Sequence, residues 1–394
     1  MNKFAPPKRL QGIEKSVIRQ VFDRAKPGSI NLGLGEPDLP TPDVIRRAAV
    51  KAIVEEQNGY TSHAGLPALR EKVAGDYPYL GGKPERVVIT AGSQEALYLA
   101  LLALVDEGDE VLLPNPGFVA YPTIVQMAGG TAKFYRLPRE RGFAFDADEF
   151  RRALSPRTKV VVCISPSNPT GRTLSREDLA GIGDALRDHG AYLISDEIYR
   201  DLYYTAERPG SLSSLYERTI VISGLSKSMS MTGWRLGWAC GDEAVIQATL
   251  VLHGYVTTCA STVSQKASLV AWTEEAEAAR AGFRETFRAR RDHLLGLIES
   301  ELGLHAVTPE GAFYTMLDVS DYGPSMQVAD ALLNEGVITV PGAAFGSESE
   351  GFLRVSFCAA HGVLEEGVRR IKRGLEIFGP VNREQVRKRG LPPP

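Results

Sequence analysis

Residues 223–238 read Ser-Gly-Leu-Ser-Lys-Ser-Met-Ser-Met-Thr-Gly-Trp-Arg-Leu-Gly-Trp. Lys227 stands among small and hydroxylated residues, directly after the apolar run 219–223, which is a poor place for a solvated surface charge. A site of this kind lowers the pKa of a lysine amine and allows it to form a Schiff base with an aldehyde cofactor. Because most lysines are solvated, this interpretation depends on the partners of Lys227 elsewhere in the chain.

Those partners occur in order along the sequence. Asn168 lies in Ser-Pro-Ser-Asn-Pro-Thr-Gly, and Asp196 and Tyr199 lie in Ile-Ser-Asp-Glu-Ile-Tyr. Arg235 follows Lys227 within the same stretch. The ordered combination is far more specific than any one of these motifs.

The combination resembles the motifs of fold-type-I pyridoxal-5′-phosphate (PLP) aminotransferases of class I/II, a family with aspartate, aromatic and methionine types. The resemblance extends from Asn-Leu-Gly-Leu-Gly-Glu-Pro-Asp (31–38) to Gly-Phe-Leu-Arg-Val-Ser-Phe (351–357). It implies an α/β fold in which a large domain has a mostly parallel central sheet flanked by helices, beside a smaller α+β domain. The implied division is an N-terminal segment, 1–42, that joins the small domain; a large PLP-binding domain, 43–283; and the C-terminal small domain, 284–394.

The hydrophobic pattern favours the same fold class independently. Short apolar runs rich in β-branched residues alternate with amphipathic segments of helical period, which is typical of an α/β protein. The expected buried strands are 87–90, 110–113, 159–164, 191–195 and 219–223.

Two helical segments have clear signals at their ends or in their composition. Ser175 and Asp178 form a capping box that predicts the start of a helix, and Gly190 predicts its end. Residues 273–302 are rich in Ala, Glu and Arg, and predict one long helix or two helices that meet at a kink. Strands are expected after it near 313–317 and 352–357.

Composition excludes several classes of protein. A length of 394 residues suffices for two domains, and a net charge of −3 gives no strong attraction to nucleic acid or membrane. The N-terminus has no apolar segment of a secretion signal, and no apolar run approaches the ~20 residues that span a bilayer. Four scattered cysteines fit reduced thiols, and six histidines show no metal-ligand spacing. We therefore expect a cytoplasmic enzyme without a metal site, with a solvated basic tail at 381–394.

The resemblance assigns the contacts to the cofactor ring. Asp196 would pair with the pyridine nitrogen and keep it protonated, although an Asp after a strand is equally often a helix N-cap. Tyr199 and Asn168 would bond the phenolic oxygen of the ring, and Asn-Pro-Thr-Gly is also a turn motif. Phe118 matches the aromatic residue that stacks on the ring.

The phosphate of the cofactor requires backbone donors and a cation. Gly92, Ser93 and Gln94 follow the strand 87–90 and begin a helix, whose N-terminal N–H groups suit a phosphate. Taken alone, this stretch is more often an ordinary strand–helix connection. Arg235 would add a charge-assisted contact and Ser226 a hydroxyl.

Two further positions bear on the contacts to the phosphate. Many relatives have a serine where this chain has Gly224, so one side-chain contact is left open. Tyr60 matches the tyrosine that reaches the phosphate of the neighbouring subunit, which implies a homodimer with shared active sites. Packing in an aromatic core is the alternative for Tyr60.

The substrate site follows from the same resemblance. Arg354 matches the arginine that binds the α-carboxylate of the substrate, with Asn168 and the backbone N–H of Gly35 beside it. Segment 253–262 contains no arginine, whereas some aspartate-specific relatives have a basic residue there. Neutral, apolar or aromatic side chains are therefore favoured, with glutamate as a possible second donor; Tyr255 and Thr257 are candidates to line the pocket. An aspartate-type activity remains open.

The implied reaction is a ping-pong transfer of an amino group between an L-amino acid and a 2-oxo acid. Lys227 would hold the cofactor and then move the α-proton as general base and acid. Two alternatives use the same fold. A carbon–sulfur β-lyase would need the same Lys227, Asp196 and Arg354. A non-catalytic PLP-fold sensor usually has a DNA-binding domain in front, and only about thirty residues precede the first motif here.

Overall fold

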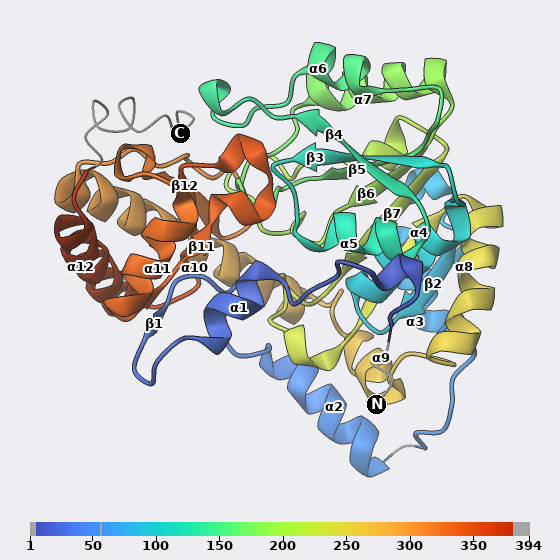
Figure 1. Cartoon of the computed structure of the whole chain (residues 1–394). Coiled ribbons are helices and arrows are strands. Elements are labelled where there is room, and N and C mark those ends of the chain that lie inside the picture. The colour runs from blue at the N-terminus through green and yellow to red at the C-terminus, as the bar shows by residue number, and fades with distance from the viewer. Residues whose placement is uncertain (1–4, 56, 381–394) are drawn as a thin grey trace.

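The computed structural model describes residues 5–55 and 57–380, and the tail at 381–394 lies outside them. Figure 1 shows a large sheet with helices on both faces, beside a smaller region formed mainly by the C-terminal part of the chain. The strands are β1 (Ile30–Asn31), β2 (Val87–Thr90), β3 (Glu110–Asn115), β4 (Thr131–Arg136), β5 (Thr158–Ile164), β6 (Tyr192–Asp196), β7 (Thr219–Gly224), β8 (Gly237–Gly241), β9 (Tyr314–Asp318), β10 (Val337–Ile338), β11 (Val340–Pro341) and β12 (Phe352–Ser356). The helices are α1 (Val17–Asp23), α2 (Asp43–Glu55), α3 (Pro67–Gly75), α4 (Ser93–Leu104), α5 (Ala120–Met127), α6 (Ala147–Ala153), α7 (Arg176–His189), α8 (Glu243–Val256), α9 (Thr262–Ser268), α10 (Glu274–Leu297), α11 (Ser325–Asn334) and α12 (His361–Phe378).

The central sheet has seven strands in the order β2-β8-β7-β6-β5-β3-β4. Only β8 runs antiparallel to its neighbours, so the expectation of a mostly parallel sheet is confirmed. The five buried strands expected from the sequence all belong to it. The prediction missed β4, an edge strand with mostly exposed or partly exposed side chains, and β8, whose short Gly-Trp-Ala-Cys-Gly run lacks β-branched residues.

Alternate side chains of each strand serve opposite faces of this sheet, as the pleat requires. In β5, Val160 and Val162 join the cluster that contains residues of α4, α5 and α8. Val161 and Cys163 join the cluster on the other face, with residues of α6 and α7. Both faces are therefore covered, which explains why the strands read as continuous apolar runs.

Helix ends follow the sequence signals closely. The Ser175 hydroxyl accepts from the N–H of Asp178, whose side chain accepts from the N–H of Ser175, so the predicted capping box is present. Gly190 ends α7 with φ 85°, a left-handed conformation that favours glycine. The segment predicted to be one or two helices is the single helix α10, extended by a wider turn at Ile298–Leu302.

The smaller region contains an antiparallel three-stranded sheet in the order β11-β12-β9. The short strand β1 pairs in parallel with β10, so a segment near the N-terminus lies beside the C-terminal part of the chain (Figure 1). The division of the chain at residues 42 and 283 stays a prediction. No helix within the described ranges is both long and apolar enough to cross a membrane.

Candidate active site

A cavity of about 250 Å³ lies where β5, β6 and β7 end. The carboxyl ends of parallel strands are the usual position for a ligand in an open α/β sheet. The structure brings most of the predicted site residues to this one cavity. They are Gly35, Ser93, Gln94, Phe118, Asn168, Asp196, Tyr199, Ser226, Lys227, Arg235 and Arg354.

Lys227 lies in the turn that follows β7, and its side chain is partly buried in the wall of the cavity. Its Nζ donates to the carbonyl oxygen of Gly35 at 2.8 Å and lies 5.9 Å from the centre of the Phe313 ring. Burial lowers the pKa of Lys227 to about 8, since removing the ammonium group from water disfavours its charge. A sizeable fraction of the amine is therefore neutral near physiological pH.

Asp196 is the last residue of β6 and is 7% exposed. One carboxylate oxygen accepts from the Tyr121 hydroxyl at 2.8 Å, and the other accepts from the N–H of Ile198 at 3.2 Å. Burial raises the pKa of Asp196 to about 6. Within the described residues no ion pair joins it to a cation, so its negative charge lacks a compensating partner.

Tyr121 was not identified from the sequence. It follows Phe118 closely in a run of apolar residues, where an aromatic side chain indicates core packing. Its ring does make an edge contact with Phe118, with 5.5 Å between ring centres. Only the fold reveals that its hydroxyl is directed at Asp196.

Arg354 in β12 is 2% exposed. Its two terminal nitrogens donate to Asn168 Oδ1 at 2.8 Å and to the Gly33 carbonyl oxygen at 2.6 Å, and Nε has no partner in the described part of the chain. The guanidinium lies between the rings of Tyr314 and Phe345, at 4.2 and 4.8 Å from their centres. Burial lowers the pKa of Arg354. A rigidly held cation without a carboxylate partner is suited to bind an anion.

Tyr199 and Tyr314 form a hydroxyl–hydroxyl bond of 3.0 Å across the cavity floor. Burial raises the pKa of Tyr199 well above its usual range and that of Tyr314 to about 12, so both remain neutral donors. A Cβ at Gly35 would lie 1.5 Å from the Tyr314 hydroxyl oxygen, which explains the glycine. The sequence predicted the strand of Tyr314, but gave no sign of a polar role.

The N-terminus of α4 meets Arg235 at one end of the cavity. Gly92 is the N-cap, with φ 95°, and a Cβ there would lie 2.4 Å from a terminal nitrogen of Arg235. Arg235 donates to the carbonyl oxygens of Thr232 at 2.8 Å and Ala91 at 3.4 Å. Gly92 does not line the cavity itself but allows the arginine to lie against the helix start, where free N–H groups favour an anion.

Four positions outside the cavity need separate comment. Tyr60 is 88% exposed and does not line the cavity of its own chain, so it does not pack in an aromatic core, and its contact with a neighbouring subunit stays a prediction. Tyr255 is 91% exposed and Thr257 bonds to Glu95, so the prediction that these two line the pocket is wrong for the described chain. At Gly224 a Cβ would lie 2.8 Å from the Leu236 carbonyl oxygen, so the close approach of β8 leaves no room for the serine of the relatives.

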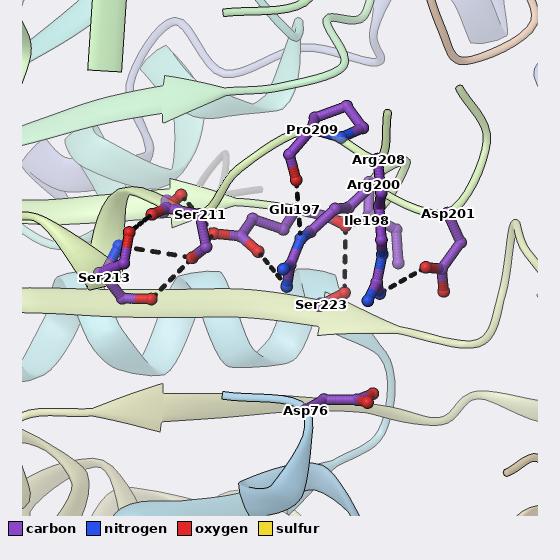
Figure 2. A network of polar contacts seen from close by, with 12 residues as sticks. Asp76, Glu197, Ile198, Arg200, Asp201, Arg208, Pro209, Ser211, Ser213 and Ser223 are labelled. Atoms are coloured by element: carbon purple, nitrogen blue, oxygen red, sulfur yellow. Dashed lines mark hydrogen bonds and ion pairs between the residues drawn. The ribbon is translucent and has the colours of Figure 1, made fainter. Parts of the chain in front are cut away.

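A separate buried cluster surrounds Glu197, the residue that follows Asp196 (Figure 2). Glu197 accepts from the hydroxyls of Ser195, at 2.9 Å, and Ser211, and its other oxygen lies 3.2 Å from Arg200. Its carbonyl oxygen accepts from the Ser223 hydroxyl at 3.2 Å, which links β6 to β7. These contacts hold the end of β6, which carries Asp196, against the end of β7, which leads into the turn of Lys227.

Comparison with known proteins places these features in context. A family model described as aminotransferase class I and II matches residues 27–371. An aspartate/prephenate aminotransferase of Thermus thermophilus is 39% identical over 356 residues, which cover 88% of this chain and 91% of that protein. An aromatic-amino-acid aminotransferase of Thermococcus litoralis is 34% identical over 379 residues, covering 93% and 97%. The solved structure of a T. thermophilus aspartate aminotransferase with maleate matches with a TM-score of 0.89 at 35% identity, covering 95% of this chain and all of that one.

Proposed function

The chain belongs to the class I and II aminotransferases, and we propose that it acts on L-amino acids with neutral or aromatic side chains. It is a PLP-dependent enzyme that moves an amino group between an amino acid and a 2-oxo acid. The observation that carries the substrate proposal is the set of cations around the cavity. Lys227, Arg235 and Arg354 are the cationic residues of the lining, and each has a different task.

Three features of the cavity fit the cofactor. The buried Asp196 lacks a cation and suits a pyridinium nitrogen. Lys227 has an amine of lowered pKa for the aldehyde. Gly92 leaves space for Arg235 against the N-terminus of α4, which together suit the phosphate, with Ser226 on the cavity wall. When bound, PLP supplies an aldehyde that takes up the amino group and a protonated ring that accepts the electron pair left at the substrate's α-carbon.

The proton transfer is the task of Lys227. Its neutral amine would accept the proton of the substrate's α-carbon and, as general acid, deliver it to the carbon that the cofactor's aldehyde supplies. The Gly35 carbonyl oxygen, 2.8 Å from Nζ, orients the amine within the cavity. Asp196 would keep a proton on the ring nitrogen, and the hydrogen bond from the Tyr121 hydroxyl orients that carboxylate.

Arg354 binds the α-carboxylate of the substrate. Its bonds to Asn168 and Gly33 and the two flanking aromatic rings leave little freedom, so the cost of ordering is met before the substrate arrives. Phe118 and Tyr199 also line the cavity, and they would contact the face and the hydroxyl of the cofactor ring.

With these assignments no cation among the described residues of the lining remains for a second carboxylate of the substrate. Ile18 and Leu34 add apolar surface, and Gln94 and Thr232 add neutral polar groups that suit glutamate as a second donor. The relatives named aspartate/prephenate and aromatic-amino-acid aminotransferases make aspartate and phenylalanine the decisive pair of substrates.

The test is the visible spectrum of the cofactor-loaded enzyme during addition of one amino acid at a time, without oxo acid. Conversion of the cofactor to its aminated form should be faster with phenylalanine or methionine than with aspartate at equal concentration. A clear preference for aspartate would overturn the substrate proposal and leave the aminotransferase activity intact. Release of pyruvate and ammonia from a cysteine conjugate, without amination of the cofactor, would instead indicate a lyase.

We also propose a cytoplasmic homodimer in which Tyr60 serves the partner's cofactor phosphate. Tyr60 and Tyr255 are 88% and 91% exposed, and Val54 and Val251 add exposed apolar surface at 75% and 61%. Mixing Lys227→Ala chains with Tyr60→Ala chains should restore activity that neither variant has, because each hybrid dimer then has one intact site. No recovery in mixed dimers would reject shared sites. The four free thiols support the cytoplasmic location.

A further inference from the structure

Two residues of segment 253–262 make a contact with α4 that the sequence did not reveal. His253, in the last turn of α8, is fully buried. Thr257 follows it by one helical turn, so both side chains lie on the same face of the helix end. That face meets Glu95 in the first turn of α4.

Glu95 divides its two oxygens between two parts of the chain. Oε2 accepts from the backbone N–H of Ala91 at 2.5 Å. Oε1 accepts from His253 Nδ1 at 3.2 Å and from the Thr257 hydroxyl. A carboxylate only accepts hydrogen bonds, so the proton on the imidazole side of this contact belongs to Nδ1. Within the described residues Glu95 has no ion-pair partner other than His253.

Ala91 is the residue at which this chain of contacts reaches the candidate phosphate site. It precedes Gly92, the N-cap of α4, and its carbonyl oxygen accepts from Arg235 at 3.4 Å. The peptide groups on both sides of Ala91 are thus held, one by Glu95 and one by Arg235. Ser93 and Gln94, the next residues, line the cavity, whereas Glu95 does not, so its negative charge is directed away from the ligand.

We propose that His253 and Thr257 are positioning residues for the cofactor phosphate, acting through Glu95 on the Ala91–Gly92 turn. They hold the Glu95 carboxylate on the side remote from the cavity, and the carboxylate holds the N–H of Ala91. The turn is thereby fixed before the phosphate binds, so the N–H groups at the start of α4 need no ordering when it arrives. This inference rests on the proposed phosphate role of the start of α4.

The proposal concerns contacts with the phosphate of the cofactor alone. The experiment therefore compares a ligand that has the phosphate with one that lacks it. Dissociation constants of PLP and of pyridoxal, which lacks the phosphate, are measured with the full-length apoenzyme. His253→Leu removes the donor to Glu95 and should weaken PLP binding at least tenfold while pyridoxal binding changes less than twofold. His253→Asn restores an N–H near the position of Nδ1, and should recover most of the loss.

A milder variant protects the test against misfolding. Thr257→Val keeps the shape of the side chain and removes one hydroxyl donor, and should weaken PLP binding about threefold to tenfold, again without affecting pyridoxal. Equal loss of PLP and pyridoxal affinity in the folded variants would show a general structural role, and unchanged PLP affinity would show no role. Either result overturns the proposal.

Arg235→Ala provides the control for the underlying assignment. If this variant loses PLP affinity selectively while the His253 and Thr257 variants do not, only the positioning role fails. If Arg235→Ala leaves the ratio of PLP to pyridoxal affinity unchanged, the proposed phosphate site at the start of α4 is itself wrong. The two failures are therefore distinguishable.

Discussion

Asp196 and Glu197 are neighbours in the chain, yet their carboxylates lie in opposite kinds of environment. Asp196 faces the cavity, with a hydroxyl and one N–H as partners and no cation. Glu197 lies in the buried cluster, where two serine hydroxyls and Arg200 surround the carboxylate (Figure 2). Asp196 is the last residue of β6 and Glu197 is the first residue after it, so one step along the chain separates the two regions.

The difference shows how a ligand site can be distinguished from a structural cluster. A buried charge is costly unless it is paired, and the Glu197 cluster satisfies that rule within the protein. Asp196, Lys227 and Arg354 have no ion-pair partner within the described residues. Burial raises the pKa of Asp196 and lowers the pKa values of Lys227 and Arg354, and each shift favours the uncharged form of the group. In the proposed assignment, the cofactor and the substrate would supply these partners.

Lys227→Ala is expected to have the largest effect on the cavity side of this comparison. Removing the amine that we assign to proton transfer should lower the rate of the amino-acid half-reaction by about 10⁴-fold or more. The rate is measured in single turnover with pre-loaded cofactor, and added methylamine tests chemical rescue. Turnover near that of the unchanged enzyme would end the proposed mechanism.

Asp196→Asn should slow the same half-reaction by about 10³-fold, because the ring nitrogen loses the anion that keeps it protonated. The same substitution should increase the stability of the apoenzyme. The pKa of Asp196 in the folded protein is about 6, above its usual 3.8, so the folded state binds more protons between these values. Stability of the apoenzyme therefore falls as pH rises through this range and stays lower above it.

The Asn variant removes that penalty, and its free energy of unfolding at pH 8 should exceed that of the unchanged apoenzyme by roughly 1–3 kcal/mol. Denaturant titration of both apoenzymes at pH 8 measures the difference. An Asn variant that is less stable and fully active would show that Asp196, like Glu197, has a structural role.

Arg354→Lys tests whether the free guanidinium serves the substrate. Lysine keeps the charge but loses the planar fork held by Asn168 and Gly33, so kcat/KM for amino acids should fall roughly 100-fold. The dissociation constant of PLP should change little. Loss of cofactor binding in place of substrate binding would contradict the assignment.

Glu197→Gln probes the paired side of the comparison. The amide keeps an acceptor for the two serines but leaves Arg200 without its anion, so the free energy of unfolding should fall by about 3 kcal/mol. Arg176→Gln is the control, since its pair with Glu207 is exposed at 83% and 74% and should contribute less than about 1 kcal/mol. Equal losses in the free energy of unfolding would show that the buried pair contributes no more to stability than the exposed pair.

The smallest expected effect is a pH dependence. Only the neutral amine of Lys227 captures the cofactor aldehyde, and its pKa is lowered to about 8. The rate at which apoenzyme takes up PLP should rise about tenfold per pH unit below 8 and level off above it. Stopped-flow absorbance between pH 6.5 and 9.5 measures this profile. A rate that still rises steeply above pH 9 would indicate an ordinary, solvated lysine.

The sequence predicted the parts of the site that belong to continuous motifs. Lys227, Asp196 and Asn168 were identified because each stands at a strand end within a characteristic run of neighbours. Tyr314 was not, because its strand reads as core and its hydroxyl acquires meaning only beside Tyr199, 115 residues away in sequence.

By itself the sequence determined the fold class, the buried strands, the helix caps and the family. These depend on local periodicity and on short motifs, which the chain order contains. The tertiary structure alone decided which charges are paired, that Tyr121 reaches Asp196 and that His253 reaches Glu95, over separations of 75 and 158 residues. Such contacts depend on the order of the strands and on the direction of each side chain. Neither can be read from the residues that neighbour a contact residue in the sequence.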